Sequence, residues 1–161
     1  MARRRGILAR ALIWTAAGLG AVHAAFSLYW AVGGTWLLAT VGQWAVRLSE
    51  DAPVLAGLGL GLVAVAKIAG AAVPVGVEYG WIGWRRFWRA LSWVGGVGLI
   101  AYGGLNIVVS GSVLAGLIDV EEGYDSAAMV GHALLWDPLF FLWGCALVFA
   151  LALSRNGYRR S

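Results

Sequence analysis

Two histidines and one aspartate are the side chains of this sequence best suited to moving protons. His23 lies in a long apolar run, and His132 lies five residues before Asp137 in another. Histidine changes its charge near neutral pH, and a neighbouring carboxylate can orient it as a general acid or base. His23, His132 and Asp137 are therefore the candidate catalytic residues, and we expect no metal site.

Other polar and aromatic side chains repeat at helical spacing around these three. Ser27 and Trp30 follow His23 at four and seven residues, and Asn106 follows Tyr102 at four. Residues with this spacing share one face of a helix. A bound molecule could contact such faces. The candidate binding residues are Lys67, Asn106, Tyr102, Ser27, Trp30 and Trp136.

The composition places these residues in a membrane. Of 161 residues, 61% are hydrophobic and 12% are charged, whereas a typical soluble domain has about 25% charged residues. The mean hydropathy is +0.79. So little charge excludes intrinsic disorder, and the single Cys145 excludes an intrachain disulfide.

Four apolar segments are each longer than the ~20 residues that a membrane crossing needs. They cover residues 7–32, 53–79, 90–117 and 127–154. Each must be helical, because no water satisfies backbone groups inside a bilayer. The sequence therefore predicts one all-α domain over residues 1–161, an integral membrane four-helix bundle.

The charged residues predict how this bundle is oriented. The arginine clusters are Arg3, Arg4, Arg5 and Arg10; Arg85, Arg86 and Arg89; and Arg155, Arg159 and Arg160. The join DVEEGYDS, residues 119–126, is acidic. Positive flanks stay in the cytoplasm, so we expect both termini inside and the acidic join outside the cell membrane. The clusters also predict contact with anionic lipid at the inner face, and no nucleic-acid partner.

Between the first two crossings, residues 36–48 have apolar side chains at helical spacing. This segment is either a short amphipathic helix on the outer surface or an irregular loop held by its tryptophans. Tryptophans gather at membrane interfaces, which predicts the same outer position for three of them. These are Trp30, Trp36 and Trp44.

Two features of the polar residues lead to further predictions. Lys67 and Asp137 are the ionisable residues of opposite sign that lie deepest in the crossings. Because an unpaired charge there costs about 2.5–3.5 kcal/mol, we expect them to form an ion pair, directly or through one water. Pro138 lacks an N–H and predicts a kink directly after Asp137.

Three stretches resemble a known family. HAAFSLYWAVGGTWLL in the first crossing and its join, YGGLNIVVSG in the third and GHALLWDPLFFLWG in the fourth are similar to the bacterial family catalogued as domain of unknown function 3995. The resemblance covers nearly the whole chain. It implies a small multi-pass membrane protein with four helices and assigns no catalytic residue.

Several functions remain compatible with these residues. Motifs of serine hydrolases, zinc proteases, P-loop proteins and c-type haem proteins are absent. We expect a non-enzymatic accessory or structural bundle, paired with a second copy or another membrane protein, without a cofactor. The alternative is a membrane-embedded enzyme or binder for a lipid-like or small apolar molecule. A b-type haem protein, with His23 and His132 as axial ligands, is a further alternative.

Overall fold

The structure is a computed structural model that describes residues 2–121 and 123–154. Glu122 and the third arginine cluster (Arg155, Arg159 and Arg160) lie outside the described residues. The described chain is all-helical, as predicted, and four of its helical stretches are long and apolar enough to cross a membrane. They are α1 (Ala2–Ala31), α3 (Pro53–Glu78), α4 (Arg85–Leu114), and the continuous run of α5 (Ser126–Gly131), the π-helical turn η2 (His132–Trp136) and α6 (Asp137–Ser154).

The helices follow the predicted apolar segments and differ from them mainly at charged ends. α4 begins at Arg85 rather than at residue 90, and α1 begins at Ala2 rather than at residue 7. Both extensions carry arginines. An arginine can keep its aliphatic stem on apolar surface while its charged head reaches water, so these charges do not end the helices.

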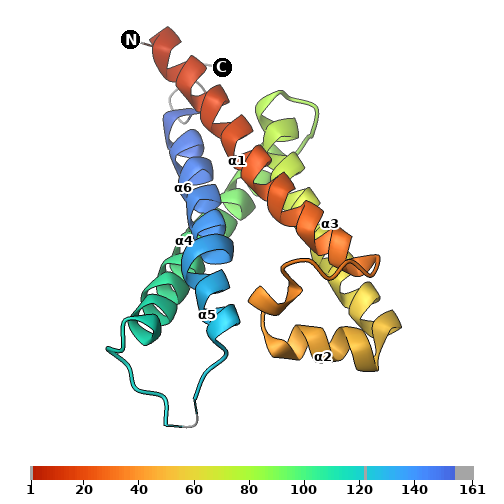
Figure 1. Ribbon diagram of the computed structural model, residues 1–161. Coiled ribbons are helices and arrows are strands. Elements are labelled where there is room, and N and C mark those ends of the chain that lie inside the picture. Colours follow the sequence, from red (N-terminus) through yellow and green to blue (C-terminus); the bar gives the residue numbers. More distant parts are fainter. Residues whose placement is uncertain (1, 122, 155–161) are drawn as a thin grey trace.

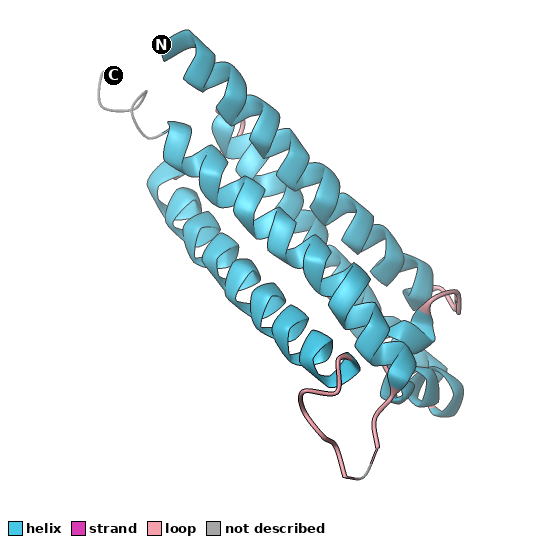
Figure 2. Ribbon diagram, turned by 60° about the vertical axis from the view of Figure 1, so that its left-hand side comes forward, coloured by secondary structure: helices cyan, strands magenta, loops and turns pink. Residues whose placement is uncertain are grey.

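The four long helices contact one another unequally. α1 lies along both α3 and α6, and α4 lies along α6, whereas α3 and α4 have little contact (Figure 1, Figure 2). At one end of the molecule, the Trp14 indole N–H donates to the Tyr79 hydroxyl over 3.0 Å. At the other end, the Gln43 backbone N–H donates to the Asp125 carboxylate over 2.9 Å. The start of α1 and the end of α6 lie at the same end (Figure 1).

Glycines allow α4 and α6 to approach closely. A Cβ on Gly103 would lie 2.6 Å from the Asp137 carbonyl oxygen, and a Cβ on Gly144 would lie 2.6 Å from the Gly96 carbonyl oxygen. α1 meets α6 in the same way, since a Cβ on Gly20 would come within 2.6 Å of the Trp143 ring. Small residues therefore form the packing surfaces between these helices.

The segment between α1 and α3 contains both a helix and an irregular part. A short 3-10 turn, η1 (Leu38–Thr40), precedes α2 (Gln43–Asp51). The amphipathic helix therefore exists, but it begins at Gln43 rather than at Trp36. Gly42 separates the two elements with φ +137°, a conformation that glycine adopts far more easily than other residues.

Trp30, one of the three tryptophans expected at the outer interface, is buried within the protein. Its side chain is 6% exposed, and its indole N–H donates to the Trp36 carbonyl over 2.9 Å. It packs edge-on against Trp136, and Leu38 of the folded-back segment lies in the same cluster. Trp36 and Trp44 are exposed.

Candidate functional site

Lys67 connects α3 to α1 through two hydrogen bonds. Its Nζ lies 2.8 Å from the Ser27 hydroxyl, to which it donates, and 2.9 Å from His23 Nδ1. Ser27 in turn donates to the His23 carbonyl over 3.3 Å. We call these three residues the lysine cluster. The four-residue spacing of His23 and Ser27 placed them on one face, and that face holds the lysine.

The predicted direct ion pair between Lys67 and Asp137 does not form. Within residues 2–121 and 123–154, the ion pairs join Arg89 to Glu78 and His132 to Asp137, and none includes Lys67. The reason lies in the packing. α3 turns its lysine toward α1, where a serine and a histidine meet it, while Asp137 finds its partner on the helix in which it lies.

Asp137 is fully buried and bonded to His132. The distance between Asp137 Oδ2 and His132 Nδ1 is 2.7 Å. His132 is the first residue of η2, and Asp137 is the first residue of α6, directly before Pro138. Because proline has no N–H to continue the regular pattern, a wider π-helical turn forms where the sequence predicts a kink. This turn brings residues five apart to the same side. We call His132 and Asp137 the aspartate pair.

Hydrogen bonding defines the proton content of the aspartate pair. His132 Nε2 lies 3.3 Å from the Val41 carbonyl, which can only accept, so Nε2 carries a hydrogen. The contact between Nδ1 and Asp137 Oδ2 then holds one proton, whether the pair is imidazolium with carboxylate or imidazole with carboxylic acid. In both forms the pair is neutral overall, which suits a buried position in a membrane.

The segment between α1 and α3 covers the aspartate pair. Besides the Val41 carbonyl, it supplies the Thr40 hydroxyl, which accepts from the Trp136 indole N–H over 3.0 Å. Thr40 also packs against Gly131, where a Cβ would clash with its backbone. The pair is thus fixed by a loop as well as by helices.

Two further predicted residues, Asn106 and Tyr102, lie on α4 near these clusters. Asn106 of α4 lies beside the Asp137 carboxyl, although Asp137 Oδ1 is buried without a hydrogen-bond partner among the described residues. Tyr102 is 54% exposed and lies one helical turn away, edge-on to Phe140 at 5.8 Å between ring centroids. His23 stacks on the other side of this region, with its ring 3.8 Å from that of Phe140.

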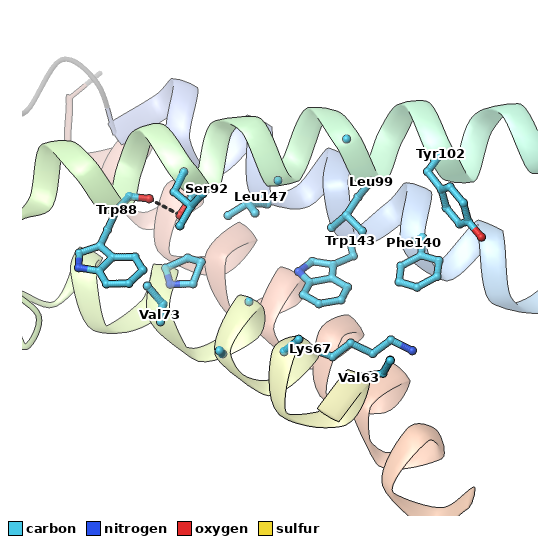
Figure 3. Close-up of a pocket in the computed structure, with 17 residues that line it drawn as sticks. Val63, Lys67, Val73, Trp88, Ser92, Leu99, Tyr102, Phe140, Trp143 and Leu147 are labelled. Carbon is cyan, nitrogen blue, oxygen red and sulfur yellow. Dashed lines mark hydrogen bonds between the residues drawn. The ribbon is translucent and has the colours of Figure 1, made fainter. Parts of the chain in front are cut away.

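A groove of about 670 Å³ lies between α3 and α4, with α6 as its floor (Figure 3). Small residues on both walls leave this space open, including Gly70 on α3 and Gly95 and Gly98 on α4. Val63 and Leu91 also line it and are about half exposed. The groove therefore opens to the side of the molecule, where a bilayer would place lipid.

The groove is apolar along its length and has a charged group at one end. The Lys67 stem runs along the α3 wall, and its Nζ lies near Phe140 and Tyr102, at the opposite end from Trp88 (Figure 3). The distance from Nζ to the Phe140 ring centroid is 5.3 Å. Trp143 of α6 forms part of the floor.

Sequence reasoning missed the groove and the loop contacts to the aspartate pair. Phe140 and Trp143 follow Trp136 at helical spacing, so an extended aromatic face on α6 was open to prediction. Gly95 and Gly98 did not indicate the groove, because the sequence does not distinguish a glycine in a helix contact from a glycine that lines an open space. The Val41 contact is made by a backbone carbonyl and leaves no trace in residue type.

The histidines predicted as haem ligands are both engaged in contacts within the protein. His132 has both ring nitrogens in hydrogen-bond contacts, and His23 uses Nδ1 toward Lys67. His23 Nε2 is buried without a hydrogen-bond partner among the described residues. Haem ligation by both rings would require His132 to give up one of its contacts.

Comparison with known proteins adds a family but no activity. Residues 20–147 match the model of a family described as a protein of unknown function, DUF3995. The matched region includes both clusters and every residue that lines the groove. No curated protein and no solved structure matches the chain.

Proposed function

Since the chain belongs to the DUF3995 family, a family of unknown function, we propose its role from its own geometry. The protein binds one lipid-like molecule in the lateral groove between α3 and α4. The observation that carries this proposal is the groove itself. Its volume of about 670 Å³ falls in the range of about 300–1,000 Å³ common for small-molecule sites.

Binding, rather than acid–base catalysis, fits the placement of the polar residues. His132 and Asp137 do not line the groove, so a molecule held there does not meet the groups that share a proton. The lysine cluster joins α1 to α3. The aspartate pair joins η2 and α6 to the segment between α1 and α3. Both act as hydrogen-bonded links between segments, a common use of polar residues in membranes.

The proposal includes the location and orientation of the protein. It lies in the cell membrane with both termini in the cytoplasm, and its arginine-rich end meets anionic lipid at the inner face. Exposed Trp81 and Trp84 at that end support the assignment, since tryptophan favours the interface.

Orientation is testable with single cysteines in a Cys145→Ala background. Glu121→Cys should react with a membrane-impermeant thiol reagent added to intact cells, because residue 121 lies in the acidic join. Arg86→Cys should react only after the cells are opened. Both positions are exposed in the structure, so burial does not protect either one. The opposite labelling pattern would reverse the proposed orientation.

Groove binding is testable by filling the groove. Gly98 lines the groove, and a Cβ added there meets nothing within 4 Å, so Gly98→Leu should occupy the space without disturbing the helices. We expect wild-type protein to retain a lipid-like molecule through purification, detected by mass spectrometry, and Gly98→Leu to lose it.

The matched control is Gly111→Leu. Gly111 lies on the same helix, also has nothing within 4 Å of an added Cβ, and does not line the groove. This variant should retain the molecule as wild type does. Equal retention by Gly98→Leu and Gly111→Leu would contradict binding in the groove.

A further inference from the structure

The charge of Lys67 has no counter-ion among the described residues. Its Nζ contacts a hydroxyl and an imidazole nitrogen, both neutral partners in this arrangement, and forms no ion pair with a described carboxylate. An ammonium group has three hydrogens, so two such contacts leave one N–H for another acceptor. This group lies at one end of a groove whose lining is mostly apolar.

We propose that the molecule held in the groove is a long-chain fatty acid whose carboxyl group pairs with Lys67. This inference rests on the proposed function and specifies the ligand class. Charge complementarity carries it, because a carboxylate supplies the missing negative charge at the one end of the groove where the wall is cationic. Among the described lining residues, Lys67 is the charged one.

Charge pairing explains how an acid is held at this depth. A carboxylate and an ammonium are each costly in the bilayer core when unpaired. In the groove the fatty-acid carboxylate and the Lys67 ammonium form a pair with zero net charge. No proton is transferred in this step. His23 and Ser27 hold the nitrogen in place.

The hydrocarbon chain fits the rest of the groove. From Tyr102 to Trp88 the α4 wall is about 21 Å long at 1.5 Å per residue, comparable to an extended sixteen-carbon chain. Phe140, Trp143 and Leu147 form the floor beneath it. The chain therefore runs from Lys67 toward the arginine-rich end of the molecule, between α3 and α4 (Figure 3).

The test compares two probes of equal chain length, palmitic acid and 1-hexadecanol, on the purified wild-type protein. Hydrogen bonds to charged groups contribute about 1.5–3 kcal/mol, so we expect palmitic acid to bind at least about tenfold more tightly. Lys67→Met should abolish this preference while still binding both probes. Arg10→Met, which removes an exposed cation outside the groove, should keep the preference.

The outcomes separate this inference from the proposed function. If wild type binds both probes equally and Gly98→Leu weakens both, the groove binds lipid but the carboxylate assignment is overturned. If neither probe binds, or Gly98→Leu binds both as wild type does, the proposed function itself fails. The comparison of probes on wild type needs no substitution, so it stays decisive even if Lys67→Met does not fold.

Discussion

His132→Leu should lower the free energy of unfolding by about 3–5 kcal/mol, the usual loss when one partner of a buried pair is removed. It leaves the fully buried Asp137 carboxyl without its hydrogen-bond partner at 2.7 Å. Asp137→Leu should cost less, because the His132 side chain is 25% exposed and is not left fully buried without a partner. Reversible unfolding in detergent measures both losses.

Two double variants distinguish the observed pair, His132 and Asp137, from the pair expected from sequence, Lys67 and Asp137. His132→Leu with Asp137→Leu should lose at least about 1 kcal/mol less than the two single losses together, as contacting residues do. Lys67→Met with Asp137→Leu should be additive within about 0.5 kcal/mol, because the two side chains share no contact. Coupling between Lys67 and Asp137, with additivity for His132 and Asp137, would contradict the two separate clusters.

Gly103→Ala should destabilise the protein by about 1–3 kcal/mol, the typical cost of overpacking. The new Cβ would lie 2.6 Å from the Asp137 carbonyl oxygen and 2.8 Å from the Phe141 backbone nitrogen. Backbone atoms cannot rotate away as a side chain does, so α4 and α6 must move apart. Thermal unfolding in detergent measures the loss.

The neighbouring glycine provides the control for that substitution. A Cβ on Gly104 would lie 3.5 Å from the Phe141 ring, an ordinary contact, and alanine favours a helix over glycine by about 1 kcal/mol. Gly104→Ala should therefore be neutral or slightly stabilising. Equal losses for the two variants would show that close approach at Gly103 does not matter.

The helices could be predicted because the bilayer leaves few alternatives. Long apolar runs must form helices there, so the crossings followed from the sequence with differences mainly at charged ends such as Arg85. The shared face of His23 and Ser27 was also predictable, since helical spacing alone defines it. Both side chains contact Lys67, as a common face allows.

The partners of the polar residues could not be predicted, because partner choice depends on which helices are neighbours. The cost of an unpaired charge predicts that Lys67 has a polar partner, but it does not distinguish Asp137 from the residues of α1. The burial of Trp30 could not be predicted for a related reason. Its position near the end of α1 indicates an interface, and only the following segment, which folds back, buries it beneath Leu38.

The most direct test of groove binding is an experimental structure of the wild-type protein in a lipid bilayer disc. We expect one continuous, elongated density in the groove between α3 and α4, running from Trp88 to Lys67, and its loss in Gly98→Leu. A wild-type groove closed by contact between α3 and α4, or filled by a helix of a second copy, would contradict the proposal that it holds a lipid-like molecule.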